Sequence, residues 1–469
     1  MTALMVQGCT SWAGKSLLTT ALCRWFARCG LKVAPFKAQN MSNNARVVDG
    51  GEIGVAQWLQ ARAAGAEPDV RMNPVLLKPE AAGSQVVRLG RYDAELSRRP
   101  WPDRSEALWP TVASALDELL ASHDLVVIEG AGSPAEINLA ANDIVNMRVA
   151  ARAGAPVLLA ADIDRGGAFA HLYGTWSLVA DEHRHLIRGF ILNRFRGDVS
   201  LLPPGPEQLE RLTGVPTIGV VPMLAHDLPD EDGAALHAPC RGGRTPVAIV
   251  RYPSASNLDE FVRLEQVADV RWATRPAHLD DVAIVVLPGS KHVAADLAWL
   301  RRTGLGDAVR AKAETGIRVL GICGGLQLLG DRLVDPHGVD GSGEGLGLLP
   351  LTTTFGAGKA VRHRTVVLPA GWPAPWGSLS GRKVRGYEIR HGRTVVDGSV
   401  DLATDEALFV ARNNVAGWYL HGLLEDSDLL KVLFGARPTR TLDETFDVLA
   451  DAVDAHLDTT YLRQLTGIA

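Results

Sequence analysis

The sequence predicts an α/β protein made of two α/β domains in series. Short runs that are apolar at every position alternate with helical stretches along most of the 469 residues. Such runs are typical of parallel strands that are covered by helices on both faces. A polar stretch rich in Asp, Gly and Pro, residues 226–244, interrupts the pattern before strands resume. We therefore expect a domain over residues 1–235, a second over residues 245–435, and a helical tail over residues 436–469.

The apolar runs also predict the individual elements. In the first domain, strands are expected at residues 3–7, 33–36, 125–129, 156–161, 189–192 and 217–221, with helices at 15–28, 104–121 and 206–212. In the second domain, strands are expected at residues 247–250, 282–287 and 317–322, followed by a β-rich insertion over 351–396.

Composition restricts the function classes. The formal net charge is −5 and 22% of the residues are charged, so neither a nucleic-acid partner nor a polybasic membrane contact is expected. The chain opens on a strand without an apolar leader, and its longest apolar runs are too short to span a membrane. Five cysteines, odd in number and scattered, indicate a reduced cytoplasmic protein. The hydrophobic content of 46% is an ordinary globular value and provides ample core. The sequence leaves open whether the chain forms a homo-oligomer.

A glycine-rich loop follows the first strand and opens the first helix. Residues 8–16 read Gly-Cys-Thr-Ser-Trp-Ala-Gly-Lys-Ser, one residue longer than G-x-x-x-x-G-K-[ST]. This spacing resembles the loop of dethiobiotin synthetase and its relatives. Backbone N–H groups at such a helix start hold phosphate oxygens, while the lysine reaches the β- and γ-phosphates. We expect ATP to contact Gly8, Thr10, Gly14, Lys15 and Ser16; a glycine-rich turn with a surface lysine is the weaker alternative.

Polar residues at strand ends complete this first site. Glu129 ends the apolar strand 125–129 and, with the Ser16 hydroxyl, is expected to bind Mg²⁺. Asp49 is a further candidate metal ligand, although it and Glu52 are equally suited to contact a substrate. Asn193 follows another strand, where an amide side chain can either read the nucleotide base or cap the next turn.

The segment Gly-Ile-Cys-Gly-Gly at residues 321–325 predicts a nucleophile elbow. It lies between an apolar strand and a helix, and its glycines permit the strained backbone that such an elbow requires. A thiol at a helix N-terminus is favoured in the reactive thiolate form. Cys323 is therefore the candidate nucleophile, with a small buried cysteine in a tight turn as the alternative.

Partners for this thiol are expected at the ends of neighbouring strands. His421 ends an apolar run about a hundred residues later, and Glu425 is a candidate to orient its imidazole. Backbone N–H groups of Gly324 and Gly289 would form an oxyanion hole. Together these residues predict a glutaminase, in which the thiol attacks the side-chain amide of L-glutamine and ammonia leaves.

Longer segments resemble the cobyric acid synthase family, the glutamine-hydrolysing enzymes of cobalamin biosynthesis. The resemblance covers about residues 3 to 430. In the first half it is carried by segments 37–42, 49–54, 72–79, 129–139, 143–147, 161–167 and 193–198, and in the second by 287–291, 321–325, 386–389 and 419–422. It implies an N-terminal P-loop NTPase domain of dethiobiotin synthetase type and a C-terminal class I (triad-type) glutamine amidotransferase-like α/β domain.

The resemblance also implies an activity. ATP, Mg²⁺ and glutamine would serve to amidate four carboxylates of a corrinoid, adenosylcobyrinic acid a,c-diamide. Because both motifs occupy one chain and free ammonia is mostly protonated near neutral pH, we also expect ammonia to pass directly from one centre to the other. Three features depart from the family pattern: Trp12 stands where Asp is common, Arg390-His391 stands where His-Met is expected, and the tail beyond residue 440 has no match. A cobyrinic acid a,c-diamide synthase is the alternative enzyme, and a P-loop positioning or partitioning ATPase is the alternative of a different class.

Overall fold

The structure is a computed structural model that describes residues 2–80, 83–229 and 243–468. Its contacts divide the chain into two compact units. The first comprises Met1–Ser42, Val48–Leu228 and Arg440–Ala469, and the second comprises Asn43–Val47 and Pro229–Thr439. The linker predicted over residues 226–244 falls mostly on residues 230–242, which lie outside the described part.

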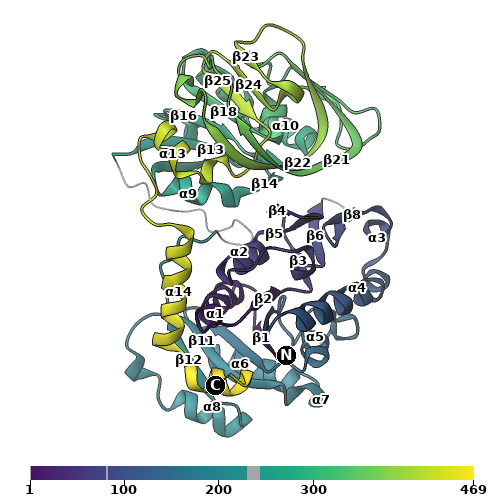
Figure 1. The fold of residues 1–469 in the computed structure, drawn as a ribbon, viewed down its shortest axis with the longest axis vertical. Helices are drawn as coiled ribbons and strands as arrows, with labels where there is room; N and C mark the ends of the chain where they lie inside the picture. The colour runs from purple at the N-terminus through teal and green to yellow at the C-terminus, as the bar shows by residue number, and fades with distance from the viewer. Residues whose placement is uncertain (1, 81–82, 230–242, 469) are drawn as a thin grey trace. The chain divides into compact units, whose positions relative to one another are not determined.

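The first unit is built on a six-stranded parallel sheet with the order β12-β11-β10-β1-β9-β2 (Figure 1). The strands are β1 (Thr2–Gly8), β2 (Val33–Phe36), β9 (Leu125–Glu129), β10 (Val157–Asp162), β11 (Ile187–Phe195) and β12 (Thr217–Pro222). β9 and β10 are buried at every position, as expected for central strands that are covered on both faces. The carboxyl ends of β1 and β9 therefore meet at one edge of the sheet, where open α/β sheets bind ligands.

Helices connect and cover these strands. They are α1 (Lys15–Arg28), α2 (Val55–Ala63), α3 (Ala94–Arg98), α4 (Trp101–Ser122), α5 (Met147–Ala153), α6 (Ala168–Leu178), α7 (Asp181–Arg184) and α8 (Gly205–Thr213). Leu18, Leu22 and Phe26 recur every four residues along α1 and are buried in one cluster with Leu4 and Val6 of β1. This packing fixes the start of α1 against the end of β1.

A smaller sheet lies in the same unit. Its four strands have the order β3-β6-β7-β8 and are β3 (Gln39–Met41), β6 (Val75–Glu80), β7 (Gly83–Arg88) and β8 (Arg91–Asp93). The short strand β5 (Gly51–Gly54) precedes α2.

The C-terminal tail is part of the first unit. It forms α14 (Leu442–His456) and α15 (Thr459–Thr466), and α14 packs against α1. The Trp25 indole of α1 donates a 2.6 Å hydrogen bond to Asp454, and the Arg24 guanidinium pairs with Asp447 at 2.8 Å. The helices predicted for this segment are thus present, and the segment covers one side of the first unit.

The second unit has a seven-stranded sheet of order β15-β13-β16-β18-β25-β24-β23. Its strands are β13 (Thr245–Val250), β15 (Ala268–Ala273), β16 (Ile284–Leu287), β18 (Arg318–Ile322), β23 (Leu402–Ala403), β24 (Phe409–Arg412) and β25 (Val415–Trp418). The first five in the sheet order pair in parallel, and β24 and β23 are antiparallel.

Helices and shorter strands complete the second unit. The helices are α9 (Val262–Glu265), α10 (Val293–Arg302), α11 (Leu305–Glu314), α12 (Gly324–Leu329) and α13 (Ser427–Phe434). The predicted β-rich insertion is a long antiparallel pair, β21 (Leu351–Val367) with β22 (Lys383–Val396). β19 (Arg332–Val334) and β20 (Gly343–Glu344) extend this sheet beyond β21, in the order β20-β19-β21-β22. β14 (Ala255–Ser256) pairs with β17 (Gly289–Ser290), and β4 (Ala45–Val48) runs through the inserted segment Asn43–Val47.

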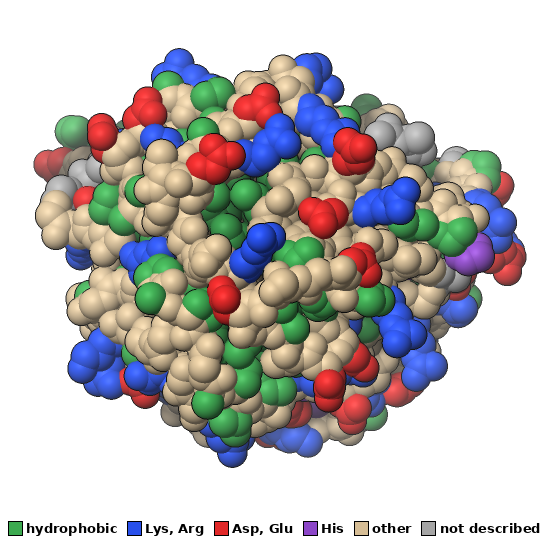
Figure 2. Space-filling model, turned by 90° about the horizontal axis from the view of Figure 1, so that it is seen from above, with side chains coloured by type: hydrophobic (Ala, Val, Ile, Leu, Met, Phe, Trp, Pro, Cys, Tyr) green, Lys and Arg blue, Asp and Glu red, His purple; other side chains and the backbone are tan. Residues whose placement is uncertain are grey.

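The predicted α/β fold is confirmed in both halves. Each strand and helix expected from the apolar runs has a counterpart whose ends agree to within three residues. Among the described residues, no helix is long and apolar enough to cross a membrane. On the face drawn in Figure 2, basic and acidic side chains are intermixed, and no large region carries a single sign of charge.

Two candidate active sites

The glycine-rich loop joins β1 to α1 in a conformation that only small residues permit. Gly14 has φ 88°, and a Cβ added there would lie 2.0 Å from the Asn193 Nδ2 atom. A Cβ added to Gly8 would lie 2.9 Å from that of Ala13. The Asn193 amide itself donates a 2.8 Å hydrogen bond to the Ala13 carbonyl. Asn193 therefore supports the loop from the end of β11, a contact that neither of its two expected roles included.

Lys15 lies at the first position of α1 with its side chain almost fully buried. Its Nζ donates to the Gly132 carbonyl at 2.9 Å and to the Thr10 carbonyl at 3.2 Å. Neutral carbonyl acceptors hold the ammonium weakly enough for phosphate oxygens to compete, because charged pairs are about twice as strong. Trp12 has φ 67° and is 37% exposed. It precedes Ala13 in the loop, whereas Lys15 follows Ala13.

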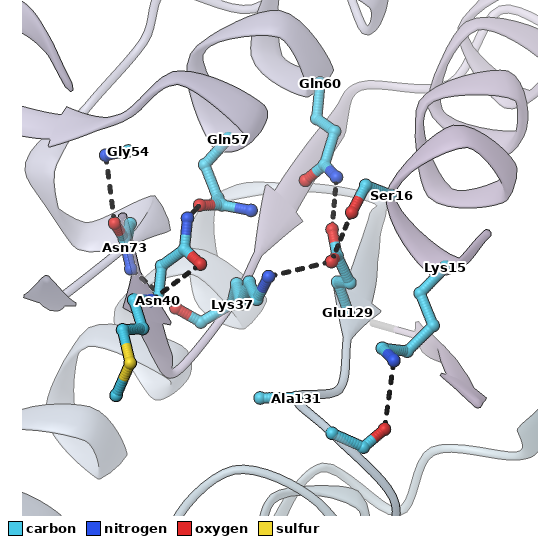
Figure 3. A network of polar contacts seen from close by, with 12 residues as sticks. Lys15, Ser16, Lys37, Asn40, Gly54, Gln57, Gln60, Asn73, Glu129 and Ala131 are labelled. Carbon is cyan, nitrogen blue, oxygen red and sulfur yellow. Dashed lines mark hydrogen bonds and ion pairs between the residues drawn. The ribbon is translucent and has the colours of Figure 1, made fainter. Parts of the chain in front are cut away.

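Glu129 is the centre of a buried polar network at the end of β9 (Figure 3). The carboxylate accepts hydrogen bonds from the Ser16 hydroxyl at 2.8 Å, from the Lys37 ammonium at 2.9 Å and from the Gln60 amide at 2.5 Å. Glu129 and Lys37 are both more than nine-tenths buried. The sequence predicted Ser16 and Glu129 as neighbours, but it did not single out Lys37 or Gln60. Lys37 directly follows β2, and β2 pairs with β9 in the parallel sheet. This sheet order was the one signal from which the contact of Lys37 with Glu129 could have been predicted.

The oxygen pair of Ser16 and Glu129 suits Mg²⁺, which prefers hard oxygen ligands and keeps several waters. In the described ranges, no group of three or more His, Cys, Asp or Glu residues is arranged to hold a metal ion. Asp49, the third expected ligand, is exposed and forms a backbone bridge with Asp69. An ion here would therefore take its remaining ligands from phosphate oxygens and water.

Other acidic residues near the strand ends form ion pairs with Arg or Lys side chains. Asp162 pairs with Arg165 at 3.3 Å and with Arg194 at 3.4 Å. Glu52, which the sequence offered for metal or substrate, forms a buried ion pair with Lys78.

The second site begins at the turn from β18 to α12. Cys323 occupies this turn with φ 52° and ψ −108°, so the predicted strained elbow is confirmed. Glycine is required at the two positions after Cys323, because neighbouring backbone atoms lie too close for a side chain. A Cβ added to Gly324 would lie 2.5 Å from the Ser290 N atom, and one added to Gly325 would lie 1.9 Å from the Leu287 oxygen. The turn after β16 thus packs directly on the elbow.

His421 lies just beyond β25, and its contacts fix the ring. Its Nδ1 is 3.0 Å from a Glu260 carboxylate oxygen, and the other oxygen of Glu260 accepts the Gly422 N–H at 3.0 Å. The Tyr387 ring stacks on the imidazole with centroids 5.5 Å apart, and the two backbones exchange hydrogen bonds of 2.9 and 3.1 Å. His421 and Glu260 are at most 1% exposed. A carboxylate on Nδ1 leaves Nε2 available for proton transfer.

Cys323 and His421 lie on either side of one turn, since Gly289 approaches the His421 ring and Ser290 packs against Gly324, the residue after the thiol. Burial alone would lower the pKa of His421, but the charge of Cys323, the charge of Glu260 and side-chain hydrogen bonds with both raise that pKa to about 10. The imidazolium form is therefore favoured at neutral pH.

The orienting contact expected from Glu425 is made by Glu260 instead. The Glu425 carboxylate forms an ion pair with the Arg46 guanidinium. The physical reason lies in the backbone: Gly422 has φ 81° and begins a short 3₁₀ helix, Leu423–Glu425, which carries Glu425 away from Nδ1. Glu260 comes from another 3₁₀ helix, Leu258–Phe261, 161 positions earlier in the chain.

The expected oxyanion-hole residues lie next to the elbow and the imidazole. A Cβ added to Gly289 would be 2.9 Å from the His421 Cε1 atom. The turn that carries Gly289 is held by Tyr252, whose hydroxyl donates to the Pro288 carbonyl, and by Asp296, which accepts the Ser290 hydroxyl at 2.6 Å. Burial raises the pKa of Asp296 above its ordinary value. Gly289 and Gly324 therefore lie on two turns that pack against each other at the elbow.

The departure at Arg390-His391 is accommodated by ion pairing. Arg390 is buried, lies 3.9 Å from the centroid of the Tyr419 ring and is 3.5 Å from the buried Glu388 carboxylate. Arg364 pairs with the same carboxylate at 3.0 Å. The Gln327 amide donates a 2.9 Å hydrogen bond to the His391 carbonyl, a contact that does not depend on the side chain at position 391.

Replacing Glu260 with glutamine should lower glutaminase kcat by between about 10²- and 10⁴-fold, since losing the orienting acid of a triad has cost about 10⁴-fold elsewhere. The folded-state pKa of His421, raised to about 10, should fall because one of its charge partners is lost. The alkaline limb of the pH–rate profile, where the imidazolium loses its proton, should accordingly move to lower pH. Glu425→Gln is the matched control, and an equal loss in both variants would contradict the assignment of Glu260.

Comparisons with known proteins agree with this two-site arrangement. Residues 4–231 match the family model of the CobQ/CobB/MinD/ParA nucleotide binding domain, and residues 246–429 match that of the CobB/CobQ-like glutamine amidotransferase domain. A protein of Variovorax paradoxus named cobyric acid synthase is 58% identical, with 98% of each chain covered. Proteins of the same name from Polaromonas sp. (55% identical; 99% of this chain, 98% of the relative) and Paracidovorax citrulli (57%; 97% of each) are also similar.

Proposed function

Because the chain belongs to the cobyric acid synthase family, we propose that it converts the b, d, e and g carboxylates of adenosylcobyrinic acid a,c-diamide to carboxamides, giving adenosylcobyric acid. The chain is an ATP-dependent amidotransferase with a nucleotide-binding domain and a glutamine amidotransferase domain. Its substrates are accordingly glutamine and a corrinoid. ATP, glutamine and reduced thiols are all supplied by the cytoplasm, where we place the reaction.

Nitrogen release would use the second site. The Cys323 thiolate adds to the side-chain carbonyl carbon of glutamine. The resulting oxyanion accepts hydrogen bonds from the N–H groups of Gly289 and Gly324. The His421 imidazolium gives its proton to the departing nitrogen, so that ammonia leaves and a thioester remains. Water, deprotonated by His421, then adds to the thioester carbonyl and expels the thiolate with glutamate as product. Glu260 keeps the imidazole oriented through both proton transfers.

Carboxylate activation would use the first site. An oxygen of the corrinoid carboxylate attacks the γ-phosphorus of ATP, ADP leaves, and an acyl phosphate forms. Ammonia then attacks the acyl carbon, and inorganic phosphate leaves with the oxygen that the carboxylate supplied. The Lys15 ammonium, which donates hydrogen bonds to two carbonyls, would donate instead to the transferring phosphate. A bound Mg²⁺ would be held by Ser16 and Glu129 and would neutralise phosphate charge.

The observation that supports this function most strongly is the strained turn at Cys323 together with the buried pair of His421 and Glu260. A positioning or partitioning ATPase requires the phosphate loop but has no use for a thiol on a strained elbow beside an imidazole. The alternative enzyme, a cobyrinic acid a,c-diamide synthase, shares both sites. The segments at residues 37–41 and 72–79 favour the cobyric acid synthase reaction over it.

The choice of carboxylates is tested by supplying two corrinoids separately to the purified enzyme with ATP and glutamine. With adenosylcobyrinic acid a,c-diamide, mass spectrometry and NMR should show amides accumulating at b, d, e and g. With cobyrinic acid, the a and c carboxylates should remain unmodified. Amidation confined to a and c would assign the chain to the alternative enzyme instead.

A further inference from the structure

A short segment from the N-terminal half of the chain is built into the amidotransferase unit. Residues up to Ser42 and from Val48 to Leu228 belong to the nucleotide-binding unit, whereas Asn43–Val47 belongs to the second unit. Lys37, which pairs with Glu129 in the phosphate site, lies nine positions before Arg46. One stretch of chain therefore supplies a residue to each unit.

Arg46 is the charged residue of this segment, and it is 5% exposed. Its guanidinium pairs with the carboxylates of Asp259 and Glu425. It also lies 5.3 Å from the centroid of the Tyr387 ring. Asp259 and Glu425 raise the pKa of Arg46 well above its ordinary value although burial opposes them, so the side chain remains a cation.

Each partner of Arg46 is adjacent to a part of the catalytic centre. Asp259 precedes Glu260, the acid on His421 Nδ1, within the 3₁₀ helix Leu258–Phe261. Glu425 ends the 3₁₀ helix that begins after Gly422, directly beyond His421. Tyr387 stacks on the imidazole itself. A single guanidinium thus joins the three elements that hold the imidazole and its acid.

Neighbouring residues of the segment fix the same loop. The Asn44 side-chain oxygen accepts the Leu258 N–H at 3.1 Å, and the Ala45 carbonyl accepts the Asn257 amide at 3.1 Å. The Asn257 amide also donates to the Tyr387 hydroxyl at 3.1 Å. Asn257 has φ 56°, a conformation that external contacts must hold.

We propose that Arg46 is a positioning residue of the glutaminase centre: from the N-terminal half of the chain, it holds Glu260 and His421 in the geometry that glutamine hydrolysis requires. Without the cation, the Asp259 and Glu425 carboxylates would face each other without compensation, and their loops would have to shift. A displacement of about 1 Å in a supporting residue is enough to lower a rate by about 10²-fold. The inference rests on the proposed glutaminase role of Cys323 and His421.

The test compares Arg46→Ala, Arg46→Lys and the surface control Arg152→Ala in the full-length enzyme. Arg152 pairs with Asp117 on an exposed part of the first unit. We expect Arg46→Ala to lower glutaminase kcat by about 10²-fold, with KM for glutamine changed much less. Arg46→Lys should retain an intermediate kcat because it keeps the charge. Guanidinium ions added in millimolar amounts should partly restore Arg46→Ala.

Ammonia-driven amidation separates positioning from misfolding, because it does not use the glutaminase centre. It should stay within about twofold of wild type in Arg46→Ala, since the residues of the phosphate site belong to the other unit and sites that share no partners act independently. Unchanged glutaminase kcat, or equal loss of both activities, or a loss that neither lysine nor guanidinium relieves, would overturn the proposal for Arg46. If instead the wild-type enzyme showed no Cys323-dependent glutaminase activity, the proposed function itself would fail.

Discussion

Replacing Cys323 with alanine should abolish amidation driven by glutamine and leave amidation driven by ammonium salts intact. In the proposed mechanism the sulfur attacks the glutamine amide, and removal of a triad nucleophile has cost up to about 10⁶-fold in kcat elsewhere. Glutaminase activity should therefore fall at least about 10⁴-fold. The phosphate loop, Glu129 and Lys37 lie in the other unit, so the corrinoid should still be amidated from free ammonia. Glutamate release and amide formation are measured in parallel with each nitrogen source.

Cys29→Ala is the matched control for this substitution. Cys29 is a half-buried free cysteine at the end of α1, outside both candidate sites. The Cys29→Ala variant should retain both glutamine-driven and ammonia-driven amidation. Loss of ammonia-driven amidation in Cys323→Ala, or survival of glutamine hydrolysis in it, would argue against Cys323 as the nucleophile.

Replacing Lys15 with methionine should produce the reciprocal phenotype. Both glutamine-driven and ammonia-driven amidation should fall by at least about 10²- to 10³-fold, because the variant lacks a charge that stabilises the transferring phosphate. Glutamine hydrolysis without ATP should remain near its wild-type basal rate, since Cys323, His421 and Glu260 are in the second unit. ADP release, amide formation and glutamate release are the three readouts.

Lys32→Met is the control for Lys15→Met, because Lys32 is exposed after the end of α1. It should match wild type in all three readouts. Normal ADP-coupled amidation in Lys15→Met would mean that the phosphate is stabilised by other groups and would remove the loop lysine from the mechanism.

The local geometry of both sites was predictable because it is encoded by local residues. The glycines at positions 14 and 324 permit the loop and elbow backbones, and the apolar runs before them fix strands that deliver Lys15 and Cys323 to the sheet edge. The contact of Ser16 with Glu129 followed from two neighbouring parallel strands in the same way. Such features depend on residues that are adjacent in the chain or on a regular sheet.

The partners of these residues were harder to predict because they come from distant segments. Glu260 reaches His421 from 161 positions away, at the end of no predicted strand. Glu425, four positions from His421, was the better candidate by sequence distance, but the positive φ of Gly422 turns it away. Arg46 lies in the N-terminal half, and no periodicity indicates that its segment belongs to the amidotransferase unit. Ion pairs of this kind depend on tertiary packing, which local patterns do not specify.

In the proposed reaction, one chain releases ammonia at Cys323 and activates a carboxylate with ATP at the phosphate loop. The most direct test supplies a corrinoid whose free carboxylates carry ¹⁸O, together with ATP and glutamine labelled with ¹⁵N at the side-chain amide. Each new amide should contain ¹⁵N, and one ¹⁸O should appear in inorganic phosphate for each amide formed. Amide formation with unlabelled phosphate would contradict the acyl phosphate, and amides without ¹⁵N would contradict glutamine as the nitrogen source.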